Sequence, residues 1–522
     1  MKKLLTILVA VIIAGGTPIF AQKEVDKQIK KLIISAYTIN QHYVDSVDTE
    51  KLVEDAIRGM LEKLDPHSQY STAEQTKKLN EPLQGSFDGI GVQFNILDDT
   101  LMVIQTITNG PSEKAGVMAG DKIVSVNDTI IAGVKMAQED IMKRLRGKRG
   151  TKAHLGILRD GINDTLHIDV IRDKIPLNSV DASFMITPHT GLIRFSNFAM
   201  TTHSEVVEAI DKLKSQGMKN LILDVTQNGG GYLQAAAKIA SEFIPKGELI
   251  VYTQGRVYDA QYFNSHGGNA FQEGKVIVLV DEYSASAAEI LAGAIQDQDR
   301  GLVVGRRSFG KGLVQRPVEL PDGSMIRLTI SKYYTPSGRC IQKPYKKGKE
   351  KEYRMDVINR FNHGELTNAD SIHFPDSLKF QTLRKGRTVY GGGGIMPDYF
   401  VPLDTTKNTS LYRQIVAKRI LIDANLRYLA KYRNELKKKY PTFEDFRRKY
   451  EVPKEIIDNI YTEARKALKD KYPTDEEEKT TGLLKHMLRA LAARDLWDMS
   501  EYFAIIYEDD DIVKKAIQLM EE

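Results

Sequence analysis

Cysteine and tryptophan are almost absent from this chain, since its 522 residues include one of each. With Cys340 as its single cysteine, the chain has no internal disulfide and lacks the thiolates that a zinc cluster needs. No His-Glu-x-x-His segment occurs either, so we expect neither a metal nor another cofactor. We expect Cys340 to be buried or incidental, because no histidine or helix start lies near it in the sequence.

An excess of one charge is also missing. The chain has 74 Lys and Arg against 69 Asp and Glu, a formal net charge of +5. A balance this close does not indicate nucleic acid as a partner. Hydrophobic residues make up 42% and charged residues 27% of the chain, as in ordinary globular proteins, and the length allows two to four domains.

Residues 1–21 differ from the rest of the chain. Lys2 and Lys3 precede an apolar run over residues 4–14, and the segment ends with the small residue Ala21. This pattern is typical of a secretory signal peptide, and the run is shorter than the roughly 20 residues that span a bilayer. We therefore expect an exported, periplasmic protein. If the segment stays uncut, it would hold the protein at the membrane.

The remaining chain divides into four segments by its hydrophobic periodicity. Apolar residues at helical spacing over 24–80 predict an N-terminal helical region, residues 22–84, which would need docking or dimerisation to cover its apolar face. Alternation over 85–172 predicts a compact β-rich domain with one short helix. Strands and helices alternate through 173–404, which indicates an α/β layered core. Residues 405–522 are mostly charged and predict a helical cap.

Three segments of the α/β region carry residues suited to catalysis. In the first, a buried strand leads through the glycines of residues 229–231 into a helix. Glycines at such a junction free backbone N–H groups to approach a ligand, and the helix start adds positive potential. The segment could therefore form an oxyanion hole or a flexible strand–helix turn. It does not fit a phosphate-binding loop, because no Gly-Lys-Ser/Thr follows.

The second segment, Ser-Ala-Ser-Ala-Ala-Glu at 284–289, follows another buried strand. A serine at a strand–helix junction is either a helix N-cap or an exposed nucleophile, and the N–H groups after it can stabilise an oxyanion. In the third segment, Lys311 lies between two glycines and beside apolar residues. Such surroundings lower the pKa of a lysine, and a neutral amine can accept a serine proton. Gln315 could hold that amine in place. Taken alone, however, this segment is interpreted more simply as a loop with Lys311 on the surface.

Taken together, these segments resemble the C-terminal processing peptidases, or tail-specific proteases, of peptidase family S41. The segments are similar to the family's Asp-Leu-Arg-x-Asn-x-Gly-Gly, Ser/Thr-Ala-Ser-Ala-Ser-Glu and Phe-Gly-Lys-Gly-x-Val-Gln motifs. Further matches lie at 64–70, 294–300, 334–339 and 394–398, so that the resemblance extends over residues 40–402. Two positions depart from the motifs, with Thr226 in place of arginine and Ala288 in place of serine. The threonine at 226 puts the salt bridges of the glycine loop in question, whereas the glycine N–H donors are not affected.

The resemblance implies a role for each matched residue. Ser286 is the expected nucleophile, Lys311 the general base and Gln315 its orienting partner. The oxyanion hole is expected at the N–H groups of Gly229, Gly230 and Ala287. Asp297, in the motif at 294–300, is expected to be structural or to support the serine helix.

The β-rich domain resembles the family's PDZ domain. Its carboxylate-binding loop falls on Gly89, Ile90, Gly91 and Val92. Successive N–H groups of such a loop can receive a terminal carboxylate while the peptide adds as a strand beside the groove. Ile141 and Leu145 would line the pocket for an apolar last side chain.

The resemblance implies an α/β fold with a crotonase- or ClpP-like protease core, an inserted PDZ domain and helical N- and C-terminal regions. We expect a serine endopeptidase that selects protein substrates by free, apolar C-termini, with an adaptor or a homo-oligomer formed through the helical regions as further partners. Two alternatives remain open. A catalytically inactive PDZ scaffold would bind the same tails without cleaving them, and a crotonase-like acyl-CoA enzyme would need neither the signal peptide nor the PDZ pattern.

Overall fold

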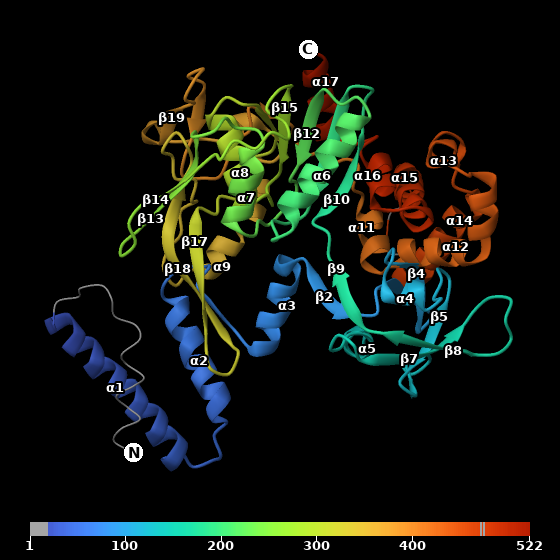
Figure 1. Ribbon diagram of the computed structural model, residues 1–522, viewed down its shortest axis with the longest axis horizontal. Coiled ribbons are helices and arrows are strands. Elements are labelled where there is room, and N and C mark those ends of the chain that lie inside the picture. The colour runs from blue at the N-terminus through green and yellow to red at the C-terminus, as the bar shows by residue number, and fades with distance from the viewer. Residues whose placement is uncertain (1–18, 470–471, 473–474) are drawn as a thin grey trace.

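A computed structural model describes residues 19–469, 472 and 475–522 (Figure 1). The first 18 residues of the predicted signal peptide lie outside this range, so the structure does not bear on it. Within the described ranges, no helix combines the length and the apolar character needed to cross a membrane.

A six-stranded sheet forms the centre of the α/β core. Its strand order is β10-β11-β12-β15-β16-β21. The β10–β11 pair is antiparallel and the other pairs are parallel. The bounds are Val180–Met185, Thr190–Phe195, Asn220–Asp224, Val276–Val280, Leu302–Gly305 and Tyr399–Phe400. The strand β15 is buried along its whole length, as expected for a parallel strand that is covered on both faces.

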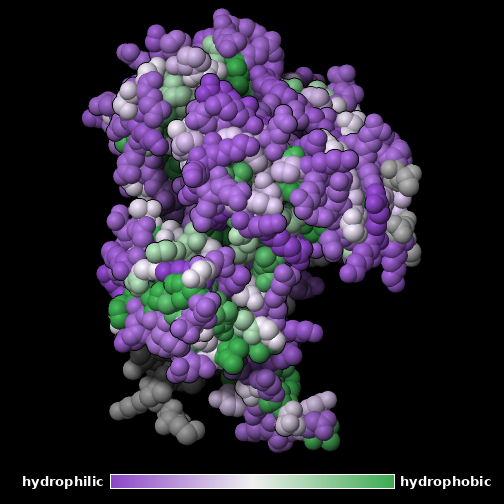
Figure 2. Space-filling view, turned by 90° about the vertical axis from the view of Figure 1, so that its right-hand side faces the viewer, coloured by the Kyte–Doolittle hydropathy of each residue, from purple (hydrophilic) through white to green (hydrophobic). Residues whose placement is uncertain are grey.

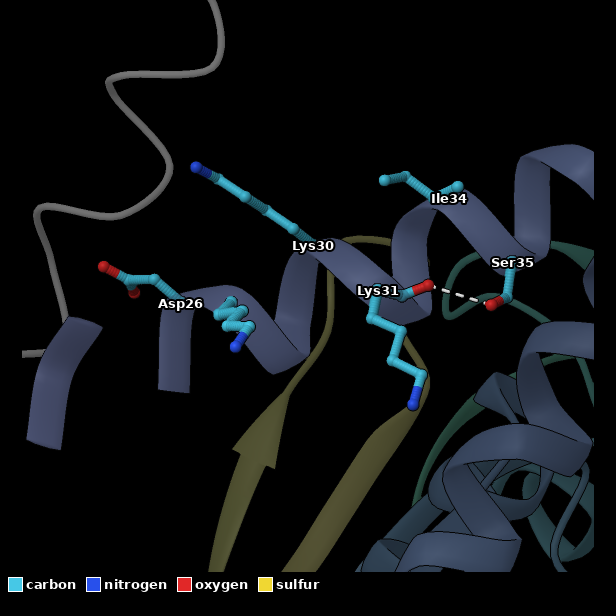
Figure 3. A pocket seen from close by; sticks show the side chains of 6 residues that line it. Asp26, Lys30, Lys31, Ile34 and Ser35 are labelled. Carbon is cyan, nitrogen blue, oxygen red and sulfur yellow. Dashed lines mark hydrogen bonds between the residues drawn. The ribbon is translucent and has the colours of Figure 1, made fainter. Parts of the chain in front are cut away.

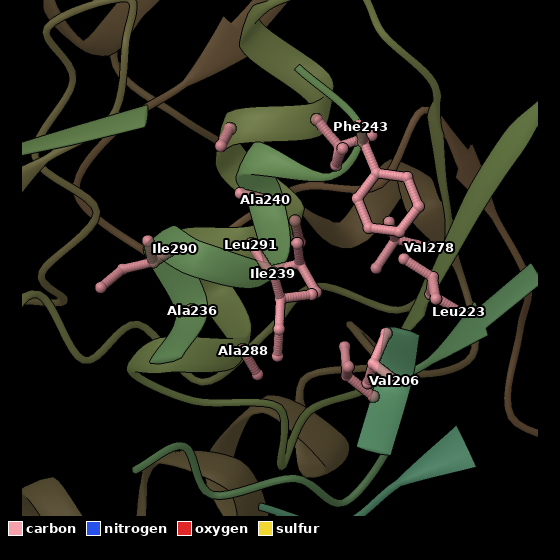
Figure 4. Close-up of a cluster of buried hydrophobic side chains, with 14 of the residues drawn as sticks. Val206, Leu223, Ala236, Ile239, Ala240, Phe243, Val278, Ala288, Ile290 and Leu291 are labelled. Carbon is pink, nitrogen blue, oxygen red and sulfur yellow. The ribbon is translucent and has the colours of Figure 1, made fainter. Parts of the chain in front are cut away.

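Helices cover both faces of this sheet. On one face, side chains such as Leu223 and Val278 pack against α6 (Thr202–Ser215), α7 (Leu233–Ser241) and α8 (Ala287–Asp297), as Figure 4 shows. On the other face, the alternate residues Ile222 and Ile277 pack against α17 (Asp511–Glu521), at the end of the chain. The layered α/β core predicted from the sequence is therefore present, and its second layer comes from the C-terminal segment.

A second sheet lies beside this core and was largely missed from the sequence. Its strands are β1 (Gln69–Ser71), β13 (Leu249–Gly255), β14 (Gln261–Asn264), β17 (Leu313–Glu319) and β18 (Met325–Tyr334). The sequence predicted only the first part of β18. The helical prediction for 24–80 is wrong at residues 69–71, because they pair with β18 as a strand.

The N-terminal helices are α1 (Ile19–His42), α2 (Thr49–Glu62) and α3 (Ala73–Gln84). The helix α1 extends away from the body of the molecule (Figure 1), and apolar side chains on it such as Ile29, Leu32 and Tyr37 are exposed. These side chains have no cover within the described chain, so the expected docking or dimerisation of this region stays a prediction.

The β-rich domain is joined to the core through an antiparallel pair, β2 (Ser86–Gly89) and β9 (Asp173–Pro176). Its other elements are β3 (Val92–Leu97), β4 (Thr100–Thr106), α4 (Pro111–Lys114), β5 (Lys122–Val126), β6 (Thr129–Ile130), α5 (Gln138–Leu145), β7 (Lys152–Leu158) and β8 (Leu166–Ile171). The predicted short helix and the β7–β8 hairpin are confirmed. Figure 2 shows apolar side chains gathered on the lower half of the molecule, and the exposed ones of this domain include Ile130 and Ile162.

Between β18 and the last strand of the central sheet, the chain adds the short helices α9 (Glu350–Arg354) and α10 (Asp356–Asn362) and the β19–β20 pair (Lys379–Gln381 and Thr388–Tyr390).

The C-terminal region is a helical body with its own apolar core. It comprises α11 (Ser410–Ala417), α12 (Ile420–Lys439), α13 (Phe443–Lys449), α14 (Lys454–Leu468), α15 (Glu476–Leu496), α16 (Met499–Ile506) and α17. Its α12 packs Leu426 against Met102 and Ile104 of the β-rich domain. Because α17 covers the central sheet, this region contacts both the β-rich domain and the core (Figure 1).

Candidate active site

Ser286 lies at the turn between β15 and α8. Its backbone has φ +57° and ψ −114°, a combination that non-glycine residues rarely adopt. Strain of this kind costs about 1–3 kcal/mol and persists where the surrounding structure enforces it. The neighbouring Ser284 is fully buried, and its hydroxyl donates to the Val225 carbonyl oxygen at 2.7 Å. Of the two serines in the motif, only the half-buried Ser286 can therefore meet a substrate.

Ser286 opens into a cavity of about 760 Å³ that is lined by the second sheet, by α3 and by the glycine loop that leads into α7. Lys311, Gln315, Gly229 and Gly230 line the same cavity, so residues that are up to 86 positions apart in the sequence (Gly229 to Gln315) meet there. Another hollow lies on α1 (Figure 3), where it is lined by residues 26–35 and by no residue of the serine and lysine segments.

Lys311 is set up to lose its proton more readily than an ordinary lysine. Burial lowers the pKa of its amine most, and the nearby Arg327 guanidinium lowers it further. The carboxylates of Glu289 and Asp65 raise it, but among the described residues no ion pair joins either of them to the amine. A lysine with these neighbours is suited to act as a base near neutral pH.

Glu289 holds the serine and lysine segments together, and no role was assigned to it from the sequence. Its carboxylate is completely buried in the first turn of α8. It accepts hydrogen bonds from the backbone N–H groups of Ser286 (2.8 Å), Gly310 (2.7 Å) and Lys311 (2.8 Å), and from the Ser308 hydroxyl. The available signal was a glutamate in an otherwise apolar first turn, three residues after the predicted nucleophile.

The three predicted oxyanion donors differ in their hydrogen bonding. The Gly230 N–H donates to Asn228 Oδ1 at 2.8 Å, whereas no acceptor is recorded for the N–H groups of Gly229 and Ala287 among the described residues. Gly230 still lies against the nucleophile, because a Cβ placed on it would come within 2.8 Å of Ser286 Cβ. In this conformation, Gly229 and Ala287 are the two donors open to a ligand.

Gln315 and Asp297 each bond to residues other than Ser286 and Lys311. The Gln315 amide donates to Thr329 Oγ1 at 3.2 Å, and no hydrogen bond joins it to Lys311. Asp297 is at the opposite end of α8 from Ser286, where it forms a buried ion pair with Arg339 at 2.7 Å. Asp297 is thus the last residue of the serine helix, does not line the cavity, and has a structural role in this conformation.

The predicted carboxylate-binding loop lies where β2 ends and β3 begins. The N–H groups of Ile90 and Gly91 have no recorded acceptor within the described part of the chain, and β3 is an edge strand with one side open to a further strand. Ile141 and Leu145 are buried in the same apolar cluster as Ile90. The loop can therefore donate to an anion, and the two α5 residues belong to the apolar cluster next to it, so their place in a side-chain pocket stays a prediction.

Family models match four parts of the chain. Residues 189–351 match peptidase family S41, residues 89–170 a PDZ domain, and residues 18–75 the N-terminal domain of the activating protease CtpB. Residues 411–498, in the C-terminal helical region, match a family of unknown function.

Curated relatives agree with these matches. The carboxy-terminal-processing protease of Bartonella bacilliformis is 37% identical over 58% of this chain and 70% of its own length. The carboxy-terminal processing protease CtpB of Bacillus subtilis is 36% identical over 70% of this chain and 78% of its own. Among solved structures, the photosystem II D1 C-terminal processing protease shares 28% identity, covers 59% of this chain and 88% of its own, and gives a TM-score of 0.33.

Proposed function

This chain belongs to peptidase family S41, as a carboxy-terminal processing serine protease with a PDZ domain, and we propose that Ser286 and Lys311 form its catalytic dyad. The observation that carries the proposal is the shared cavity. A serine on a strained turn and a half-buried lysine, which has no carboxylate ion-pair partner among the described residues, open into it together.

The neutral Lys311 amine accepts the proton of the Ser286 hydroxyl as the serine oxygen attacks the scissile carbonyl carbon. The resulting oxyanion accepts hydrogen bonds from the N–H groups of Gly229 and Ala287. When the C–N bond breaks, the Lys311 ammonium returns the proton to the leaving amine. Water, deprotonated by the same lysine, then hydrolyses the acyl-enzyme and regenerates the Ser286 hydroxyl.

Cleavage of an unfolded protein with an apolar C-terminus tests this function. We expect new fragments in mass spectrometry from the unchanged chain and none from a Ser286→Ala variant. A chain that binds the tail without producing fragments would instead be an inactive PDZ scaffold.

We also propose export, on the signal-peptide pattern of residues 1–21, and the mass of the N-terminal peptide of the secreted protein would test it.

The pH dependence of cleavage is expected to follow Lys311. Because the base acts when neutral, the rate should rise as the pH rises through the pKa of this amine. Replacing Arg327 by Gln removes a like charge, so the pKa of Lys311 should increase and the rising part of the profile should move to higher pH. The matched control is Arg316→Gln, another arginine of the cavity, which is not among the groups that shift the pKa of Lys311 most. An unmoved profile in Arg327→Gln would contradict a lysine base at this position.

The free C-terminus of the substrate should matter if the loop at residues 89–92 receives it. Amidation removes the charge and changes the acceptor geometry, and charge-assisted hydrogen bonds contribute about 1.5–3 kcal/mol each. We expect peptide binding to the intact chain to weaken by about tenfold or more on amidation, measured by calorimetry with a matched pair of peptides. Equal affinity for the two peptides would contradict recognition of the free C-terminus. It would not contradict the proposed catalysis by Ser286 and Lys311.

A further inference from the structure

A buried polar cluster joins the C-terminal helical region to the strand that leads into the glycine loop. Its members are Arg194 on β11, Asp224 on β12, Thr226 just after β12 and Tyr507 just after α16. Arg194 donates from Nη1 to Asp224 Oδ2 at 2.7 Å and to Thr226 Oγ1 at 2.9 Å, and from Nη2 to the Thr226 carbonyl oxygen at 3.3 Å. The Tyr507 hydroxyl donates to the same Asp224 oxygen.

Most of the cluster is buried, and Thr226 is its half-buried member. Arg194, Asp224 and Tyr507 are 8%, 1% and 6% exposed. The ring of Phe503, from α16, lies 4.6 Å from the Arg194 guanidinium carbon. Burial raises the pKa of the Tyr507 hydroxyl well above its ordinary value, so the hydroxyl stays a hydrogen-bond donor to the carboxylate.

Arg194 brings a guanidinium to the threonine at 226. The family motif has an arginine at 226, and in this chain the guanidinium comes from the adjacent strand, since Arg194 and Asp224 are direct partners in the β11–β12 ladder. The guanidinium then bonds to both the side chain and the backbone of Thr226.

The residues after Thr226 lead directly to the nucleophile. Asn228 donates from Nδ2 to the Phe195 carbonyl oxygen at 2.8 Å, and its own carbonyl oxygen accepts from Ala285 N at 2.9 Å. Gly229 follows, with its N–H open to the cavity. A shift of Thr226 would therefore move a predicted oxyanion donor relative to Ser286.

We infer that Arg194 and Tyr507 are positioning residues for the glycine loop, and that the C-terminal helical region is thereby a working part of the active site rather than a structural cap. This inference rests on the proposed Ser286–Lys311 function. It assigns a role in the reaction to the C-terminal helical region, of which residues 411–498 match a family of unknown function and Tyr507 lies beyond that match.

Tyr507→Phe tests the inference with the smallest change, because it removes one hydroxyl and keeps the ring packing. We expect kcat to fall by about tenfold while KM stays within about twofold, since small misplacements of groups at a reacting centre mainly slow the chemical step. The matched control is Tyr461→Phe. That hydroxyl is bonded to Glu477 and Thr481 within the same helical region, away from Asp224. The control should lower thermal stability without changing kcat.

A rescue experiment separates positioning from general support. Arg194→Ala should lower kcat by more than Tyr507→Phe does, and adding Thr226→Arg should recover part of the loss by returning a guanidinium to Asp224. Unchanged kcat in Tyr507→Phe, or an equal loss in Tyr461→Phe, would overturn the inference.

Measurements on the unchanged chain separate a failure of the proposed function from a failure of the positioning role. If the unchanged chain cleaves no substrate and its Ser286 does not react with a fluorophosphonate probe, the proposed function fails. If the unchanged chain cleaves and Tyr507→Phe cleaves equally well, only the positioning role fails.

Discussion

Replacing Ser286 or Lys311 by alanine is expected to lower the rate of peptide-bond cleavage by about a thousandfold or more while the chain stays folded. The two residues act as one unit, so the loss of either should cost nearly as much as the loss of both. Initial rates on an unfolded substrate would measure the loss, and far-ultraviolet circular dichroism and the melting temperature would verify the fold.

Lys311→Arg sharpens this prediction. Arginine keeps the positive charge and much of the length of lysine, but it cannot be deprotonated in a protein. If Lys311 acts as a base, the arginine variant should be as inactive as the alanine variant. If Lys311 only supplied positive charge to the cavity, the arginine variant would keep substantial activity, and the dyad would be wrong.

Ser284→Ala is the matched control for the nucleophile. The Ser284 hydroxyl donates to the Val225 carbonyl oxygen and accepts from Asp281 N at 3.0 Å, so its loss should lower the stability of the turn by about 1–3 kcal/mol. Activity per folded molecule should remain substantial, because this buried side chain does not reach the cavity. An inactive Ser284→Ala beside an active Ser286→Ala would reverse the assignment.

The sequence alone was sufficient where function depends on short, contiguous segments. The buried strand before the serine motif and the strand–helix junction at the motif were predicted correctly, since β15 ends at Val280 and α8 begins at Ala287. A run of valine, isoleucine and leucine followed by an alanine-rich run has few other structures open to it. The family and its fold were likewise predicted from spaced motifs, and the comparisons confirm them.

The parts that sequence reasoning missed depend on partners far away in the chain. The strand β13 pairs with β18 about 80 residues later, and neither segment indicates that pairing by itself. The charged C-terminal segment was interpreted as a solvated cap, because the pattern of α17 shows an apolar face without showing that the central sheet covers it. For the same reason, Thr226 looked like a lost salt bridge until the fold placed Arg194 beside it.

Glu289→Gln is expected to lower the cleavage rate by about a hundredfold or more. The buried carboxylate accepts hydrogen bonds at both of its oxygens from donors on the serine and lysine segments. A glutamine amide has only one oxygen that can accept, and its NH₂ group would face backbone N–H donors. The cost of leaving buried N–H groups unpaired is about 1–3 kcal/mol each, and the Ser286 and Lys311 loops should move apart to relieve it. The matched control is Glu242→Gln, another buried carboxylate, which accepts from Ala270 N at 3.1 Å away from the cavity.

The pH profile of Glu289→Gln distinguishes a positioning role from direct proton transfer. The Glu289 charge raises the pKa of Lys311, so its removal should lower that pKa and move the rising part of the rate profile to lower pH. At the same time, the rate at high pH, where Lys311 is fully neutral, should fall because the two loops no longer hold their geometry. A lower plateau reached at lower pH is thus the expected signature. If Glu289 were itself the base, the rising part of the rate profile would be absent from Glu289→Gln. If the rate at high pH equalled that of the unchanged chain, the hydrogen bonds from Glu289 to the serine and lysine segments would have no part in catalysis.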